Sequence, residues 1–203
     1  MMDILFKDSQ RGFTLMEVLI SMAIGGLLMG AVVNTFVVQR KSYDIQEQVT
    51  EMVQTARAAM DMMTREIRMA GYDPTGAGFE GVSYNATQLR VNADLRGDNS
   101  SDPSDGDTND SNEDIMYSYD SNDFQIDRNT GGGNQPFAEN IDSFTFDYID
   151  GNGNPTTVSA DIRQVRVTVT ARTAKPDHEY PSGGGYRTYT LSSLIMPPNL
   201  ACP

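Results

Sequence analysis

The sequence is poor in the residues from which enzymes build active sites: its 203 residues include one cysteine, Cys202, and one histidine, His178. A lone cysteine cannot close an internal disulfide. A lone histidine, here in the loop-like segment "KPDHEYPSGGG", gives little material for a catalytic triad or a histidine-rich metal site. The HExxH, P-loop and GxSxG signatures are also missing. We therefore expect no enzyme and assign no catalytic residue or metal ligand.

Basic residues are few: 15 Lys and Arg stand against 28 Asp and Glu, which gives a net charge of −13. Because phosphate binding needs a basic surface, a nucleic-acid partner is not expected. Residues 97–114, "GDNSSDPSDGDTNDSNED", contain no basic residue and are predicted to form an acidic loop that carries more than half of this charge. Its seven acidic residues are Asp98, Asp102, Asp105, Asp107, Asp110, Glu113 and Asp114.

Charge is absent from Val18 to Val38, and proline is absent before Pro74. As a helix, this uncharged run would span ~31 Å, about the thickness of a bilayer core. A cleaved secretory signal would have a shorter apolar run followed by a small-residue cleavage site, which the "VNTF" at 33–36 is not. A plain membrane anchor would explain the length of the run but not the carboxylate of Glu17 at its edge.

The hexapeptide "GFTLME", residues 12–17, opens this apolar segment. Together with the segment, it resembles the start of a type IV prepilin. The resemblance implies a cytoplasmic leader, residues 1–12, which prepilin peptidase removes by cleavage between Gly12 and Phe13 before methylating the new amine of Phe13. It also implies that residues 13–38 span the membrane and later form the filament core, where Glu17 pairs with the Phe13 amine of a neighbouring subunit. That pairing would offset the desolvation of both charges.

The charges that flank the span do not set its orientation. Lys7 and Arg11 precede it and Arg40 and Lys41 follow it, so the positive-inside rule gives a tie. The resemblance implies a single-pass protein of the bacterial inner membrane, with its head outside the cytoplasm, that later enters a surface pilus.

Residues 39–70 continue the helix as an amphipathic half. Apolar residues recur there at spacings of three and four, which predicts one stripe that packs on the head. With Gly71 and Pro74 as stop signals, we expect one helix from about Phe13 to about Ala70. The predicted stripe consists of Ile45, Val49, Met52, Ala56, Met60, Met63, Ile67 and Ala70.

After Gly71 the apolar period changes to two, which is typical of strands. Residues 71–203 are therefore predicted to form a head in which an antiparallel sheet packs one face on the amphipathic half-helix. The expected strands lie near 89–95, 115–119, 124–126, 144–148, 165–171 and 186–196, with a hairpin turn at 120–123. The predicted fold is α+β and type IV pilin-like.

The helix exit "TREIRMAGYDPTG", residues 64–76, resembles that of PilW-type minor pilins. The resemblance implies a subunit that primes assembly of a type IV pilus and is incorporated at or near its tip, with other major and minor pilins as partners through helix packing. Two alternatives remain open. One is a J-type pseudopilin of type II secretion, and the other is a tip adhesin that binds through the exposed loops at 97–114 and 172–185.

Calcium is the one cofactor that the acidic segments leave open, because Ca²⁺ prefers oxygen ligands and related pseudopilins bind it in their heads. Neither candidate segment fits the EF-hand template. In the segment from Asp105, Asp110 occupies the place of the required glycine, and in "DGNGNPTTVSAD" (150–161) Pro155 does. We assign no calcium ligands.

Overall fold

The computed structural model describes residues 12–97 and 102–200. Most of the predicted leader, part of the predicted acidic loop and Cys202 lie outside these residues. The chain divides into two compact units, residues 1–46 and residues 47–203.

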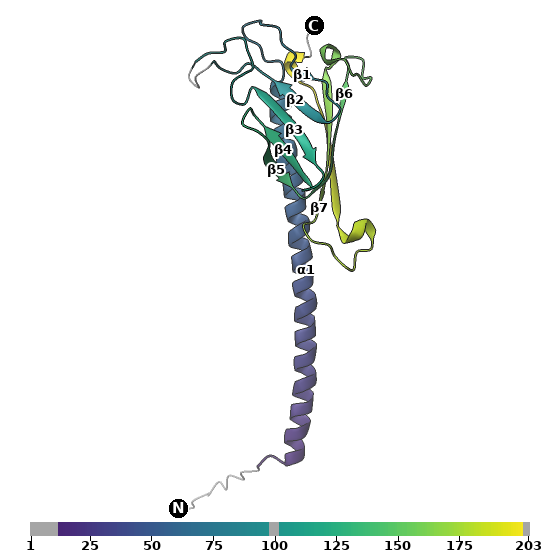
Figure 1. Ribbon diagram of the computed structural model, residues 1–203. Coiled ribbons are helices and arrows are strands. Elements are labelled where there is room, and N and C mark those ends of the chain that lie inside the picture. The colour runs from purple at the N-terminus through teal and green to yellow at the C-terminus, as the bar shows by residue number, and fades with distance from the viewer. Residues whose placement is uncertain (1–11, 98–101, 201–203) are drawn as a thin grey trace, which may run out of the picture. The chain divides into compact units, whose positions relative to one another are not determined.

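One helix, α1 (Leu15–Met69), accounts for the described N-terminal part and continues into the second unit (Figure 1). It begins and ends close to the predicted positions, and no proline interrupts it. In the first unit every residue from Gly12 to Asp44 is exposed. The hydroxyls of Ser21 and Thr35 donate to the carbonyls of Glu17 and Ala31, at 2.7 and 2.9 Å, so these polar groups have partners within the helix.

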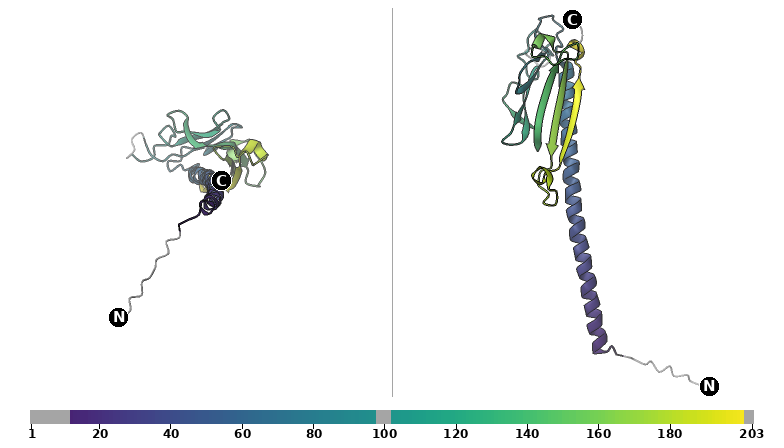
Figure 2. Two further views of the ribbon diagram at one scale, coloured as in Figure 1. Left: turned by 90° about the horizontal axis from the view of Figure 1, so that it is seen from below. Right: turned by 90° about the vertical axis from the view of Figure 1, so that its right-hand side faces the viewer.

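The second unit contains two antiparallel sheets that lie on the same side of the last turns of α1 (Figure 2). The first is a five-stranded meander in the order β1-β2-β3-β4-β5, and the second is a three-stranded meander in the order β6-β7-β8. The strands are β1 (Val82–Ser83), β2 (Gln88–Asn92), β3 (Asp114–Asp120), β4 (Gln125–Asn129), β5 (Gln135–Glu139), β6 (Ile141–Ile149), β7 (Gln164–Arg172) and β8 (Thr188–Ile195).

The α+β class is confirmed, but the strands form two sheets where one sheet was expected. The break falls at Asn140, which connects β5 to β6 with a φ of 57° and so turns the chain out of the first sheet. The β5 strand was not predicted because it contains Pro136 and lacks a clear alternation, and β1 was not predicted because it has only two residues.

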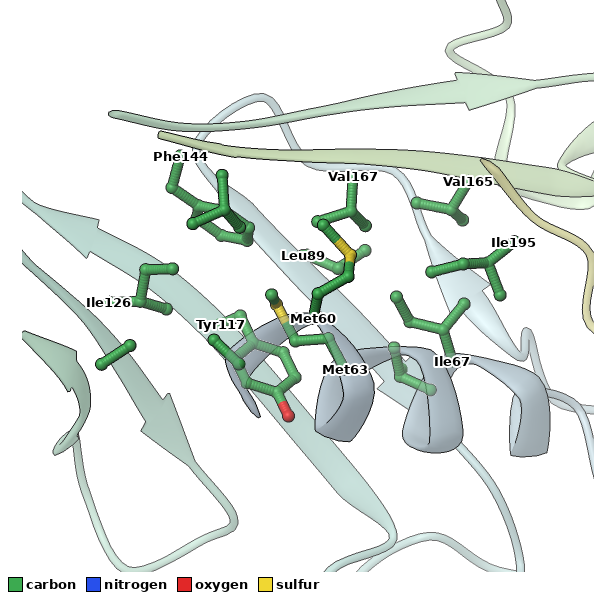
Figure 3. Close-up of a cluster of buried hydrophobic side chains, with 14 of the residues drawn as sticks. Met60, Met63, Ile67, Leu89, Tyr117, Ile126, Phe144, Val165, Val167 and Ile195 are labelled. Atoms are coloured by element: carbon green, nitrogen blue, oxygen red, sulfur yellow. The ribbon is translucent and has the colours of Figure 1, made fainter. Parts of the chain in front are cut away.

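The core lies between the predicted stripe of α1 and the two sheets (Figure 3). Met63, Ile67 and Ala56 are fully buried, as are Leu89 and Tyr117 of the first sheet. The second sheet contributes Val165, Val167, Val169 and Ile195. The prediction of an apolar stripe that packs on the head is confirmed from Met52 to Ala70, and Val49 packs against the core as a partly buried residue.

The exit of α1 is fixed by close backbone approaches. Gly71 has a φ of 73° and donates its N–H to the carbonyl of Asn92 at 2.9 Å. Gly81 passes so close that a Cβ there would lie 2.3 Å from the backbone nitrogen of Gly71. This contact ties the end of the helix to the start of the first sheet.

Candidate processing and assembly site

The segment predicted to be processed forms the N-terminal cap of α1. Thr14 precedes the first helical residue, and its Oγ1 accepts the backbone N–H of Glu17 at 3.2 Å. In return, the carboxylate of Glu17 faces the backbone N–H of Thr14 at 3.5 Å. This reciprocal arrangement is a capping box. The negative charge of Glu17 also interacts favourably with the positive N-terminal end of the helix dipole. Sequence reasoning missed this role, although the T-x-x-E spacing of 14–17 signals it.

The bond between Gly12 and Phe13 lies just before this cap. Phe13 is 83% exposed, and within residues 12–97 and 102–200 no atom outside the adjoining residues lies within 4 Å of the position that a Cβ on Gly12 would occupy. The structure therefore leaves the predicted cleavage point open and brings Glu17 together with Thr14.

The helix that follows exposes a continuous apolar surface. It is long and apolar enough to cross a membrane, and none of its most apolar window is buried. Large side chains are exposed on every side, among them Leu19, Leu27 and Phe36. An exposed apolar surface of this size is typical of a segment that lies in lipid or packs against other helices.

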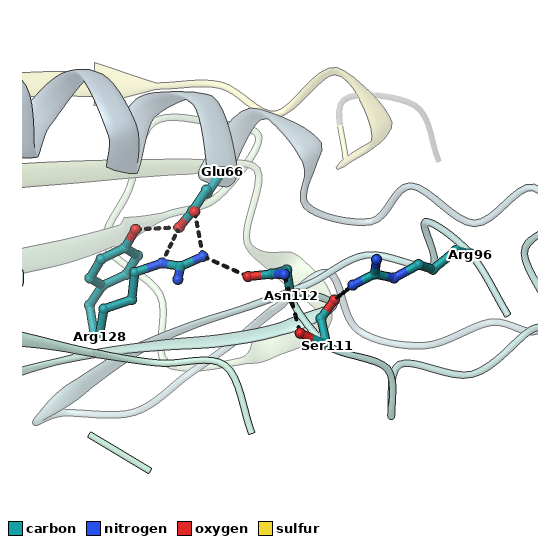
Figure 4. Close-up of polar contacts among 6 residues, drawn as sticks. Glu66, Arg96, Ser111, Asn112 and Arg128 are labelled. Carbon is teal, nitrogen blue, oxygen red and sulfur yellow. Dashed lines mark hydrogen bonds and ion pairs between the residues drawn. The ribbon is translucent and has the colours of Figure 1, made fainter. Parts of the chain in front are cut away.

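A second polar site, which the sequence did not reveal, joins the amphipathic half of α1 to the first sheet. Glu66, 15% exposed, accepts from Arg128 of β4 at 2.7 Å and also from the hydroxyl of Tyr117. Arg128 extends the network to the side-chain oxygen of Asn112 at 3.2 Å, as Figure 4 shows. Burial and the adjacent charge of Glu66 raise the pKa of Tyr117 above its ordinary range. The network couples helix position to sheet position.

The predicted acidic loop is anchored by two of its own acids. Glu113 is 1% exposed, and its Oε1 accepts the backbone N–H groups of Leu95 and Arg96, both at 2.8 Å. Asp114 is the first residue of β3 and pairs with Arg90 at 2.6 Å. These two acids therefore attach the C-terminal end of the segment to Leu95, Arg96 and Arg90.

Two further carboxylates, Asp73 and the calcium candidate Asp150, bind their own loops. Asp73 accepts the backbone N–H groups of Gly76, Ala77 and Gly78, and these bonds, that of Gly78 first, lower its pKa. Asp150 accepts those of Asn152 and Asn154 at 2.8 Å each, which lowers its pKa in the same way. The Asp/Asn pattern at 150–154 is thus explained by a turn.

No group of three or more Asp, Glu, His or Cys side chains is arranged to hold a metal ion within residues 12–97 and 102–200. His178 is exposed in the loop between β7 and β8, as the sequence predicts. The arrangement as a whole consists of a helix cap, an ion-pair network between helix and sheet, and an exposed apolar surface.

Comparison with protein families gave two matches. The model of the prokaryotic N-terminal methylation motif matches residues 7–33, and the model of prepilin peptidase-dependent protein B matches residues 45–182, which is more than half of the chain. The first description names a motif for N-terminal methylation, and the second names a protein that depends on prepilin peptidase. No curated protein sequence matches the chain.

Among solved structures, a type IV-like pilin from Thermus thermophilus is similar, with a TM-score of 0.47 and 13% sequence identity. The match covers 75% of this chain and 100% of that one. Because both values are low, the assignment rests on the two sequence models. The methylation motif, the exposed apolar helix and the family match together make this a structural, type IV pilin-like protein, and the chain belongs to the prepilin peptidase-dependent protein B family.

Proposed function

We propose that the chain is a minor pilin of the PilW type, which primes assembly of a type IV pilus and is incorporated at or near its tip. The observation that carries this proposal is the exposed apolar half of α1, which begins directly after an accessible Gly12–Phe13 bond. Such a surface needs lipid before assembly and other helices afterwards.

The division of labour along the chain follows from this role. Residues 1–12 are a leader that prepilin peptidase removes, and residues 13–38 hold the protein in the inner membrane until they join the filament core. Residues 39–70 carry the head, residues 71–203, on the side of the membrane away from the leader. The amine of Phe13 is methylated after cleavage.

Glu17 acts twice in this scheme. In the single chain its carboxylate caps the helix through Thr14. In the filament it pairs with the Phe13 amine of a neighbouring subunit, which offsets the desolvation of both groups between packed helices.

The position near the tip is supported by the acidity of the head. Residues 97–114 hold seven acidic side chains and no basic one. Like charges repeated at every subunit would repel one another along a tightly packed shaft, whereas a single copy at the tip avoids this cost.

Mass spectrometry of sheared surface filaments beside membranes tests the proposal. We expect a chain that begins at N-methylated Phe13, present in filaments at trace level beside a major pilin. A processed chain found only in membranes would indicate a type II secretion pseudopilin, and high copy number in the shaft would contradict the tip position. A chain that retains Met1 or Met2 would overturn the processing scheme.

Two variants separate the roles of Glu17. Glu17→Gln removes the charge but keeps a side chain that can complete the capping box, so we expect normal processing and loss from filaments. Thr14→Ala removes the cap at a cost of about 1 kcal/mol to the helix but keeps the charge, so we expect incorporation to persist. Equal incorporation of Glu17→Gln and the parent chain would show that no intersubunit ion pair is needed.

A further inference from the structure

The last strand, β8, has an open edge. It lies at the end of the three-stranded sheet and pairs with β7 along its full length without a register shift. Within the described residues, no strand pairs with its other side. Its sequence, "TYTLSSLI", contains no charged residue and no proline.

The hydrogen-bond pattern identifies which backbone groups face this edge. Arg172 directs its N–H to the carbonyl of Asn140, away from β8, so its pair with Thr188 is of the non-hydrogen-bonded kind. The next pair along, Thr173 with Arg187, is hydrogen-bonded at 2.9 Å. Because the two kinds alternate, every second residue of β8 presents its N–H and C=O to the open side. These residues are Thr188, Thr190, Ser192 and Leu194, and all four are exposed.

The other sheet edges within the described part of the chain are blunted. The β1 edge has only two residues, and β5 carries Pro136 and a register shift in its pairing with β4. The outer side of β6 is used at both ends, since Ile141 donates to Phe124 and the carbonyl of Tyr148 accepts from Thr156. Natural sheets protect their edges with such devices, and β8 has none of them.

We infer that the open edge of β8 is an interaction surface that takes an extended strand from a different pilin subunit. Four outward N–H groups and four outward carbonyls, repeated every second residue, match the backbone of an extended chain. The side chains of these residues, two threonines, a serine and a leucine, lie on the exposed face of the sheet and not at its edge, so they leave the edge open to a neighbouring backbone. The inference rests on the proposed function, which supplies the neighbouring subunit.

Net charge favours a different subunit over a second copy. Two copies of this chain would each carry a net charge of −13, and like net charges oppose association. A subunit of lower negative charge would not meet this repulsion. Homodimerisation through β8 is therefore an outcome that the test must distinguish.

Amide hydrogen exchange on the full processed chain provides the test, with the protein in filament and membrane assemblies compared with the same protein purified in detergent micelles. We expect the amides of Thr190, Ser192 and Leu194 to exchange more slowly in the assemblies, by a factor of roughly ten or more, because an added strand protects them. The segment that covers β5 serves as the internal control and should exchange equally in both states.

Two outcomes would overturn the inference. Equal exchange of the β8 amides in both states would show that no strand is added, and if the processed chain is nevertheless present in filaments, the proposed function stands. Slow exchange in the purified chain that depends on its concentration would make a second copy the occupant.

A matched pair of variants separates the backbone from the side chain. Thr190→Pro removes an outward N–H that β7 does not use, whereas Thr190→Ala keeps it. We expect both variants to melt at the temperature of the parent chain. In assemblies, the protection of the β8 amides from exchange should be lost in the proline variant and kept in the alanine variant. Protection that survives in Thr190→Pro would contradict the inference.

Discussion

Single residues link helix to sheet in the head. Glu66 is the clearest case, because its carboxylate accepts hydrogen bonds from both the guanidinium of Arg128 and the hydroxyl of Tyr117. No pattern in the sequence distinguishes Glu66 from the solvated acids Glu47 and Glu51 of the same helix. Its role depends on Arg128, which lies 62 residues further along the chain, and only the folded arrangement brings the two together.

We expect Glu66→Gln to lower the free energy of unfolding by about 2 kcal/mol, since it removes an ion pair with little exposure and leaves Arg128 without its charge partner. Glu47→Gln on the same helix is the control, because Glu47 is exposed, and should change stability little. Urea unfolding of the full chain in mild detergent, followed by tyrosine fluorescence, measures both. A similar loss of stability in the two variants would show that the network around Glu66 does not stabilise the fold.

Tyr148 makes a pH-dependent contribution. Burial raises its pKa to about 12, and its hydroxyl donates to the carbonyls of Asn85 and Gln88 at 3.2 and 3.1 Å. The folded chain therefore favours the neutral phenol. This contribution is complete below the ordinary tyrosine pKa of 10.0 and is lost as the pH rises from there toward 12.

The free energy of unfolding, measured between pH 8 and pH 12, should fall as this contribution is lost. In Tyr148→Phe, which keeps the buried ring but has no hydroxyl, the fall should be smaller. The difference in stability between the parent chain and Tyr148→Phe should narrow above pH 10. A difference that stays constant across this range would mean that Tyr148 does not ionise differently in the folded chain.

At the scale of the element, the periodicity of apolar residues predicted the helix and the clearly alternating strands. It did not predict the features that depend on tertiary contacts. The stripe from Met52 to Ala70 repeats over five turns, so the helix and its buried face were predictable. The β3–β4 hairpin and strands β6 and β7 alternate clearly and were also predicted. The division into two sheets depends on the turn at Asn140, a single residue whose left-handed conformation no periodicity signals.

The candidate site divides in the same way. The segment 12–17 is a local motif, so a prediction for its residues could be made from the sequence alone. The buried position of Glu113 depends on the backbone of Leu95 and Arg96, 18 and 17 residues earlier in the chain, and nothing in the acidic composition of its own segment signals that burial. A residue whose partner lies on a distant element cannot be assigned from its own segment.

The exit of α1 gives a prediction for an element junction. In Gly81→Ala the new Cβ would meet backbone atoms of Gly71 and Ala70 at 2.3 to 2.9 Å, so the junction must shift. We expect a loss of about 1–3 kcal/mol in the free energy of unfolding. Gly132→Ala, in the turn between β4 and β5, is the matched control, because nothing lies within 4 Å of its Cβ position. If the two variants are equally stable in urea, the junction can shift to accept the new Cβ without a loss in the free energy of unfolding.

On the scale of the whole molecule, the two units do different work along one helix. From Gly12 to Asp44 in the first unit the apolar side chains are exposed, and in the second unit the stripe is buried against the sheets. The same residue type therefore has two roles. Methionine occurs in both halves of α1, at Met29, which is 66% exposed, and at Met63, which is fully buried.

We expect Met63→Ala to lower the free energy of unfolding of the head by about 2–5 kcal/mol, because it leaves a cavity between helix and sheets. Met29→Ala should leave that free energy nearly unchanged, since its side chain is 66% exposed and lies outside the buried core of the head. Under the proposed function, the effect of Met29→Ala would fall instead on helix packing in the filament, and so on incorporation. Urea unfolding and the filament content of the two variants, measured side by side, test this division. A head destabilised by Met29→Ala would show that the exposed half of the helix contributes to folding, and the separation of roles would fail.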